Sequence, residues 1–284
     1  MIPLFASITH SAFSYSIGNF QLTGFGLAVL LAFVIAQIIA QHELWRRGYD
    51  PTPIGDLIFA AVIGGLVGAK VYYAILMGSF SALMSRAGFV FWGGLMGGIV
   101  AVLAMAAVKR LNLWRICDVG GIAVAAAYSL GRTGCWAVGD DYGRPWDSAL
   151  AVKFPNGAPP STVQNMIGLF HVHFPAGMQP LDVVSVYPTQ LFEVTLGFVM
   201  FVILWRLRDH KHAEGWLFGV YCAMAGVERF IIEFFRAKDD RFFGPFTTAQ
   251  MVAVIFVLVG IAIMAARWQV TARARGIYAA AGEA

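Results

Sequence analysis

The chain has 284 residues, of which 59% are hydrophobic and 13% are charged, with a net charge of +4 at pH 7. Soluble domains carry about 25% charged residues, so this composition excludes an ordinary water-soluble fold. The basic residues lie singly or in pairs, without the basic runs and interleaved aromatic residues that nucleic acid requires, so no nucleic-acid partner is expected.

Apolar stretches recur along the chain, and each is long enough to cross a bilayer as a helix of about 20 residues. They cover residues 18–40, 54–77, 89–108, 116–137, 189–206, 215–235 and 248–266. The sequence therefore predicts an all-α integral membrane protein with seven transmembrane helices, in a single polytopic domain over residues 1–284.

The connection between the fourth and fifth predicted helices, residues 138–187, is rich in proline and glycine. It is too long for a simple loop, so we expect a small irregular periplasmic cap on the bundle. Most Lys and Arg residues outside the spans lie in the first, third and fifth loops and after the last span. The positive-inside rule then predicts an external N-terminus and a cytoplasmic tail, residues 267–284, in a bacterial inner (plasma) membrane.

Several ionisable residues lie inside predicted spans, where each costs about 2.5 kcal/mol or more near the bilayer centre unless it faces the bundle interior. Arg229, Glu233 and Arg236 follow at i, i+4 and i+7, which places alternating charges on one helix face. Arg132 and Arg229 suit a phosphate, because a guanidinium group stays charged when dehydrated and pairs with two oxygens. A lipid phosphate is one candidate partner, and a purely structural ion pair between helices is the alternative.

Glycines cluster at residues 64–68, 93–98 and 131–134. Small residues in membrane helices commonly allow close helix packing. The alternative is that the backbone at these positions approaches a lipid head group.

Four motifs resemble those of the prolipoprotein diacylglyceryl transferase family. Residues 131–145, Gly-Arg-Thr-Gly-Cys-Trp-Ala-Val-Gly-Asp-Asp-Tyr-Gly-Arg-Pro, resemble its signature. Residues 91–97 are similar to its aromatic-His-Gly-Gly-Leu-x-Gly element, and residues 187–193 to its His-Pro-Ser/Thr-Gln-Leu-Tyr-Glu element. Residues 229–236 are similar to its Arg-x-x-x-Glu-x-x-Arg run, and the matches are collinear along the chain.

The chain departs from the family pattern at positions near these motifs: Phe25 replaces Tyr, Lys70 replaces Arg, Trp92 replaces His, Cys135 and Val138 replace Asn, and Asp140 replaces Glu. Tryptophan cannot accept a proton from a thiol. The alternatives for that step are His171, His173, Tyr187 or the positive field of the arginines alone.

The resemblance implies transfer of the diacylglyceryl group of phosphatidylglycerol to the lipobox cysteine thiol of prolipoproteins, with release of glycerol phosphate. Its partners would be phosphatidylglycerol, the prolipoprotein signal peptide and membrane lipids, with no cofactor and no metal. The implied catalytic residues are Arg132, Arg229, Glu233, Asp140 and Glu193. The implied substrate-binding residues are Gly143, Lys70, Gly93, Gly94, Arg236, Trp92 and Gln190.

Two other functions compete with the transferase. A catalytically silent lipid-binding homologue, or one acting on another acceptor, would account for Trp92, Cys135 and Val138. A transporter would also account for charges in the membrane. It is disfavoured because the sequence shows no evident repeat and no pair of proline-broken helices.

Overall fold

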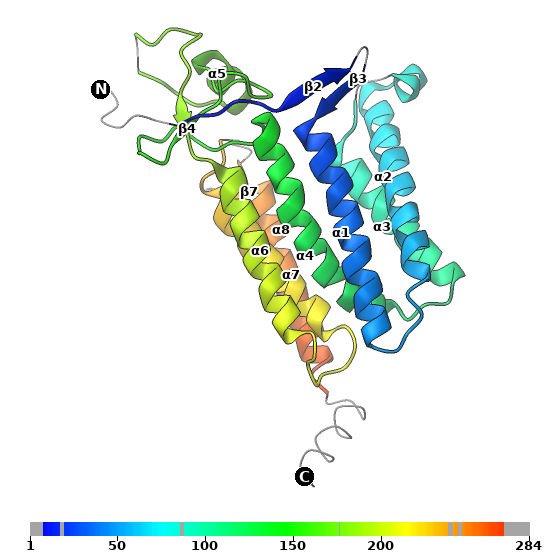
Figure 1. The fold of residues 1–284 in the computed structure, drawn as a ribbon. Coiled ribbons are helices and arrows are strands. Elements are labelled where there is room, and N and C mark those ends of the chain that lie inside the picture. The colour runs from blue at the N-terminus through cyan, green and yellow to red at the C-terminus, as the bar shows by residue number, and fades with distance from the viewer. Residues whose placement is uncertain are drawn as a thin grey trace. The chain divides into compact units, whose positions relative to one another are not determined.

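The computed structural model describes residues 8–17, 20–85, 88–175, 177–237, 241–243 and 246–269. Figure 1 shows the fold of the chain. It divides into two compact units, a first unit of Met1–Ile35 with Gly121–Ala284 and a second unit of Ala36–Gly120, and each is described by itself.

Helices dominate the described residues. They are α1 Gly24–Arg46, α2 Pro53–Met77, α3 Phe91–Val108, α4 Leu113–Val138, α5 Val163–Phe170, α6 Thr189–Leu207, α7 Trp216–Glu233 and α8 Thr248–Ala266, with a short 3-10 helix at Phe80–Met84. Within these residues, six helices are long and apolar enough to cross a membrane: α1, α2, α3, α4, α6 and α8. The prediction of an all-helical membrane protein is thus confirmed. The seventh predicted span corresponds to α7, which carries the charged residues Glu228, Arg229 and Glu233.

The strands are short and form small sheets. They are β1 Ile8–Thr9, β2 Ser14–Ile17, β3 Phe20–Thr23, β4 Val152–Lys153, β5 Ser185–Val186, β6 Arg241–Phe243 and β7 Phe246–Thr247. In the three-stranded sheet β4 is central, parallel to β1 and antiparallel to β5. The pairs β2–β3 and β6–β7 are antiparallel hairpins.

The first helix was predicted at residues 18–40, and the structure corrects both of its ends. The strands β2 and β3 pair immediately before Gly24, so the backbone of the expected first turn is used in a hairpin. At the other end, the guanidinium of Arg46 donates to the carboxylate of Glu43 at 2.9 Å. This contact pairs the buried Glu43 carboxylate in the last turn of the helix, beyond its predicted end.

In the first unit, α4, α6, α7 and α8 run along one another, as Figure 1 shows, and small residues set their spacing. A Cβ atom built on Gly226 of α7 would lie 2.5 Å from the carbonyl oxygen of Ala253 in α8. A Cβ atom on Gly197 of α6 would lie 2.9 Å from the Tyr128 ring of α4. Any larger side chain at either glycine would push the helices apart.

The cap, residues 138–187, has little regular secondary structure and is folded around a hydrophobic core. Its buried residues are Tyr142, Val152, Phe154, Met166 and Val186, joined by Ala237. The backbone is held by side chains as well: the Phe154 amide donates to Ser161 Oγ at 3.0 Å, and that hydroxyl donates to Val184 O at 2.9 Å. A proline-rich sequence hides such a core because its apolar residues follow no helical or strand period.

In the second unit, α2 and α3 cross through two of the predicted glycine clusters. A Cβ atom on Gly68 would lie 2.8 Å from Gly97 Cα and would collide with Gly93 O, while one on Gly65 would meet only Gly94 O at 3.6 Å. Close helix packing, the first of the two alternatives, therefore accounts for these glycines.

The two glycines of α2 give a matched stability test. Glycine to alanine inside a helix gains about 1 kcal/mol in propensity where space allows. We expect Gly65→Ala to keep or raise the thermal unfolding midpoint in detergent, and Gly68→Ala to lower it, because only the second Cβ meets the α3 backbone. Equal midpoints for the two variants would contradict this packing.

A buried histidine makes the cap sensitive to pH. The His10 side chain packs on Trp136 and Phe154, with ring centroids 4.8 Å and 5.0 Å away, and burial lowers its pKa below the ordinary 6.5. Because its pKa is lowered in the folded state, His10 binds a proton more readily in the unfolded state as the pH falls through 6.5. The stabilisation is therefore complete above the ordinary pKa and is lost as the pH falls below it.

We expect backbone hydrogen exchange in β4 and β5, corrected for intrinsic rates, to be faster at about pH 5.5 than at about pH 8. The variant His10→Gln lacks the titrating group and should show little of this difference. An unchanged pH dependence in that variant would assign the effect to another residue.

Candidate active site

Charged side chains of the first unit form a closed ring of alternating sign, here called the charge ring. Its members, in order around the ring, are Asp141, Arg132, Glu193, Arg229, Glu233 and Arg236. They come from α4, the loop after α4, α6, α7 and the residues just after α7. Sequence analysis singled out every member except Asp141.

The short contacts of the ring centre on Arg132 and Asp141. Arg132 Nη1 lies 2.6 Å from Asp141 Oδ2, and Arg132 Nη2 lies 2.7 Å from Glu193 Oε1. Arg236 Nη2 lies 2.7 Å from the other Asp141 oxygen, Oδ1. These are charge-assisted hydrogen bonds, which are short and strong, so α4 is tied to α6 and to the end of α7.

The remaining contacts involve Arg229 and Glu233, one helical turn apart on α7. Arg229 Nη2 lies 2.5 Å from Glu233 Oε2. The two links that complete the ring are longer: Arg229 Nη1 to Glu193 Oε1 and Arg236 Nε to Glu233 Oε2, both 3.9 Å. The predicted stripe at 229, 233 and 236 thus faces other charges inside the unit.

Burial within the ring is uneven. The side chains of Glu193 and Glu233 are 0% and 1% exposed, whereas those of Arg229 and Asp141 are 31% and 32% exposed. The carboxylates of α6 and α7 therefore form the floor of the site, and Arg229 is its most accessible cation. Among the three arginines, Arg229 is therefore the one that an approaching anion would reach most easily.

The loop that carries Asp140 and Asp141 is fastened by the start of α6. Gln190 Nε2 donates to Asp140 O at 2.6 Å, and Thr189 Oγ1 donates to Asp141 O at 2.7 Å. Of the two neighbouring carboxylates, Asp141 contacts arginines, while Asp140 Oδ1 accepts from the Asp141 amide at 2.7 Å. Asp140 was the residue indicated by the family signature, and its neighbour supplies the carboxylate of the ring.

The two aspartates differ electrostatically. Burial raises the pKa of Asp140, and the adjacent charge of Asp141 adds to the rise. Burial would also raise the pKa of Asp141, but Arg236 and Arg132 outweigh it and hold that pKa well below the usual range. Asp141 is consequently ionised over the whole range of physiological pH.

Gly143 allows three segments to meet beside the ring. Its amide donates to Tyr187 O at 2.9 Å. A Cβ atom at this position would lie 2.7 Å from Tyr187 Cβ and 2.8 Å from Thr189 Cγ2, and would collide with Phe235 O. Only glycine fits, because no side chain has room between these backbones.

Tyr128, which was not among the predicted site residues, lies one turn before Arg132 on α4. Its hydroxyl donates to Glu228 Oε1 at 3.0 Å and lies 3.3 Å from Glu193 Oε1. Its ring also lies 5.5 Å from the Arg132 guanidinium carbon. The i, i+4 spacing from Arg132 was the signal that could have identified it.

Four predicted substrate-binding residues belong to the second unit, whereas the charge ring belongs to the first. They are Lys70, Trp92, Gly93 and Gly94. Lys70 Nζ donates to Ser85 O at 2.6 Å, Trp92 is half exposed, and Gly93 packs against Gly68. Their binding roles stay predictions.

The candidate proton acceptors have other contacts. Tyr187 stacks on Trp146 with ring centroids 4.3 Å apart, and His171 caps α5 in the left-handed region at φ 56°. Within the described residues, neither these two side chains nor His173 makes a hydrogen bond or ion pair with the charge ring. A general base is therefore not identified by contact with the ring.

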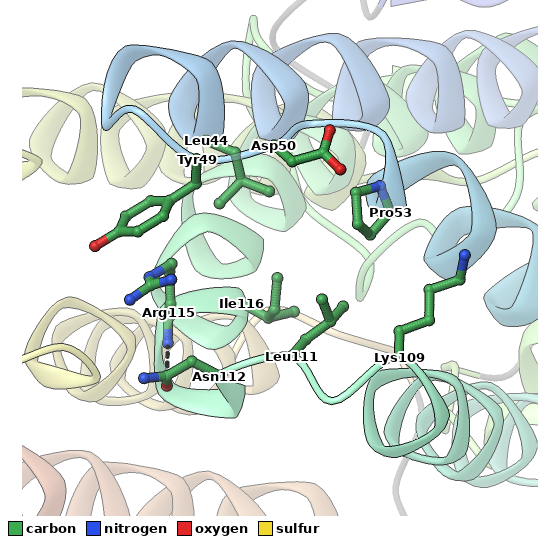
Figure 2. Close-up of a pocket in the computed structure, with 9 residues that line it drawn as sticks. All are labelled: Leu44, Tyr49, Asp50, Pro53, Lys109, Leu111, Asn112, Arg115 and Ile116. Carbon is green, nitrogen blue, oxygen red and sulfur yellow. Dashed lines mark hydrogen bonds between the residues drawn. The ribbon is translucent and has the colours of Figure 1, made fainter.

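The second unit contains a separate cavity of about 430 Å³, shown in Figure 2. Arg115 lies over the Tyr49 ring, 3.4 Å from its centroid, and its amide donates to Asn112 Oδ1. Lys109 on its wall forms an ion pair with Asp56. These contacts bind the helix ends of this unit to each other, and the cavity contains no residue that the sequence motifs indicated.

Comparison with known proteins bears directly on the charge ring. A family model described as prolipoprotein diacylglyceryl transferase matches residues 12–266. Curated proteins named phosphatidylglycerol–prolipoprotein diacylglyceryl transferase are similar over most of their length. The protein of Xanthomonas oryzae is 28% identical over 269 residues, 89% of each chain. That of Clostridium tetani is 26% identical over 254 residues, 87% of this chain and 94% of its own. That of Geobacter sulfurreducens is 28% identical over 262 residues, 87% of this chain and 91% of its own.

The matched region contains all members of the charge ring, and the predicted family resemblance is confirmed. The chain belongs to the prolipoprotein diacylglyceryl transferase family.

Proposed function

We propose that this protein transfers the diacylglyceryl group of phosphatidylglycerol to the lipobox cysteine thiol of prolipoproteins and releases glycerol phosphate. Membership of the family supports the substrate pair. The observation that carries the proposal is the charge ring, in which Arg132 and Arg229 flank the same oxygen, Glu193 Oε1, at 2.7 Å and 3.9 Å. Two guanidinium groups placed in this way can converge on one phosphate.

Arg229 is the cation best placed to meet the lipid. Its Nη2 is used by Glu233, whereas its Nη1 has, among the described residues, only the 3.9 Å contact with Glu193. The lipid phosphate could accept a hydrogen bond from Arg229 Nη1 without breaking a short hydrogen bond. Arg132, which contacts both Asp141 and Glu193, would bind the phosphate from the other side.

The chemistry needs positive charge where the leaving group forms. The sulfur attacks the carbon of the diacylated glycerol that bears the phosphate, the carbon–oxygen bond to the phosphate breaks, and the electron pair leaves on the glycerol phosphate. Overall, the thiol proton leaves with the released glycerol phosphate. Preorganised guanidinium groups in a site with little water stabilise that developing charge without reorganisation. The nucleophile belongs to the prolipoprotein, so this chain supplies the binding of the phosphate and the field that favours a thiolate.

The glycerol head group also has complementary partners on α6. Within the described residues, Glu193 Oε2 and Gln190 Oε1 are buried acceptors without a hydrogen-bond donor. The two residues are three apart on one helix and lie on the same face. We infer that they accept hydrogen bonds from the glycerol hydroxyls.

We also propose the predicted membrane arrangement: seven spans in one polytopic domain over residues 1–284 in a bacterial inner membrane. α7 would be the seventh span, since the ion pairs of Arg229 and Glu233 lower the free-energy cost of burying their charges. The cap, residues 138–187, would lie on the periplasmic side of the membrane. The tail, residues 267–284, would lie in the cytoplasm. Residues 270–284 of that tail lie outside the described residues.

The transferase reaction tests the function directly. Purified protein should move labelled diacylglycerol from phosphatidylglycerol to a peptide with a lipobox cysteine. Arg229→Ala should lower the transfer rate by about 100-fold or more, as expected for loss of a transition-state donor. Arg206→Ala, in the exposed last turn of α6, removes an arginine away from the ring and should retain activity.

Each other outcome of that experiment has a clear meaning. Folded wild-type protein that binds phosphatidylglycerol without transferring it would be a lipid-binding homologue, and the proposed function would be wrong. Transfer that survives Arg229→Ala would remove the charge ring from the mechanism.

Surface labelling tests the membrane orientation. In a variant whose native cysteines, Cys117, Cys135 and Cys222, are replaced by serine, a single Leu181→Cys in the cap should react with a membrane-impermeant maleimide added to spheroplasts. A single Lys211→Cys, between α6 and α7, should react only after lysis. The reverse pattern would invert the topology.

A further inference from the structure

We propose that Asp141 is a positioning residue that holds Arg132 and Arg236 in the geometry used during transfer. This inference rests on the function proposed above. Asp141 lies within the signature segment but is the one ring member that was not among the predicted site residues. It supplies two of the three shortest links between different segments of the ring.

The Asp141 carboxylate uses both of its oxygens, one for each arginine. Oδ2 accepts from Arg132 Nη1 at 2.6 Å, and Oδ1 accepts from Arg236 Nη2 at 2.7 Å. Arg132 lies on α4 and Arg236 lies beyond the end of α7. A single carboxylate therefore sets the separation of two guanidinium groups that belong to different segments.

The backbone of Asp141 is fixed independently of the arginines. Its φ of 63° is in the left-handed region, which aspartate tolerates better than most residues. Its carbonyl accepts from Thr189 Oγ1, its amide donates to Asp140 Oδ1, and two residues later the Gly143 amide donates to Tyr187 O. The carboxylate is consequently held on a rigid support, as a positioning group requires.

The two arginines depend on Asp141 to different degrees. Arg132 keeps its 2.7 Å contact with Glu193 if Asp141 is neutralised. Arg236 would keep only the 3.9 Å contact with Glu233 among the ion pairs of the described residues. Loss of the Asp141 charge should therefore release the Arg236 side chain while phosphate binding by Arg132 and Arg229 continues.

Loss of the Asp141 charge should affect lipid binding and the reaction rate differently. The ring contains equal numbers of arginines and carboxylates, and removal of the Asp141 charge leaves it with excess positive charge. Excess positive charge attracts the lipid phosphate, so binding should not weaken. The misplaced guanidinium should still slow the reaction, because misplacement by about 1 Å can lower a rate by about 100-fold.

The test is a steady-state comparison of Asp141→Asn with Asp147→Asn, which makes the same charge change at an exposed position of the cap. We expect Asp141→Asn to lower kcat by about 100-fold, with KM for phosphatidylglycerol unchanged or reduced. Asp147→Asn should match the wild type. A raised KM with wild-type kcat, or wild-type values for both parameters, would overturn the proposal.

A second variant covers the case in which Asp141→Asn does not fold. Arg236→Gln removes the same contact from the other side and should also lower kcat. The double variant should be no slower than the slower single variant, because both changes remove one contact. Multiplicative losses in the double variant would overturn the proposal.

The two hypotheses fail differently in this experiment. If wild-type protein transfers no diacylglycerol, the proposed function fails. If wild-type protein is active and Arg229→Ala is not, while Asp141→Asn behaves like the wild type, the function stands and only the role of Asp141 is rejected.

Discussion

The ion pair between Arg132 and Glu193 is the contact on which the rest of the site depends. The Glu193 side chain is fully buried, and its Oε1 lies 2.7 Å from Arg132 Nη2. A buried carboxylate without a partner would be destabilising by about 3–5 kcal/mol, so the contact effectively requires α4 and α6 to pack at this level. This pair then offers fixed positions to its neighbours: Tyr128 on α4 contacts Glu193, Asp141 in the loop after α4 contacts Arg132, and Arg229 on α7 contacts Glu193.

The alternating order of charges in the ring lowers the free-energy cost of placing a phosphate-binding site among membrane helices. Each arginine lies between carboxylates, so the group is electrically balanced without a ligand and can remain among apolar helices. The balance is uneven in strength, since four links lie at 2.5–2.7 Å and two at 3.9 Å. The weak links lie on either side of the Arg229–Glu233 pair, and the one at the accessible Arg229 is where an additional anion would be accommodated with the least loss of existing contacts.

Glycine serves two separate purposes in this protein. In α2 and α3 it permits two helices to approach, as at Gly68 and Gly97, and this is a packing role. At Gly143 it permits the loop after α4 to pass close to Tyr187 and Thr189, and this loop contains Asp140 and Asp141. The first use follows from sequence patterns of small residues, whereas the second depends on segments far apart in the chain.

The sequence by itself determined the membrane helices and five of the six ring members. Apolar runs of bilayer length are a local property, and a charge within such a run must find a partner, so Arg132, Glu193 and Arg229 could be selected without coordinates. The tertiary structure alone decided the start of α1, the place of Asp141 in the charge ring, and the contact of Tyr128 with Glu193. These features depend on a hairpin, on a left-handed turn and on the rotation of α4 against α6. Each is set by contacts between distant segments, which no local pattern encodes.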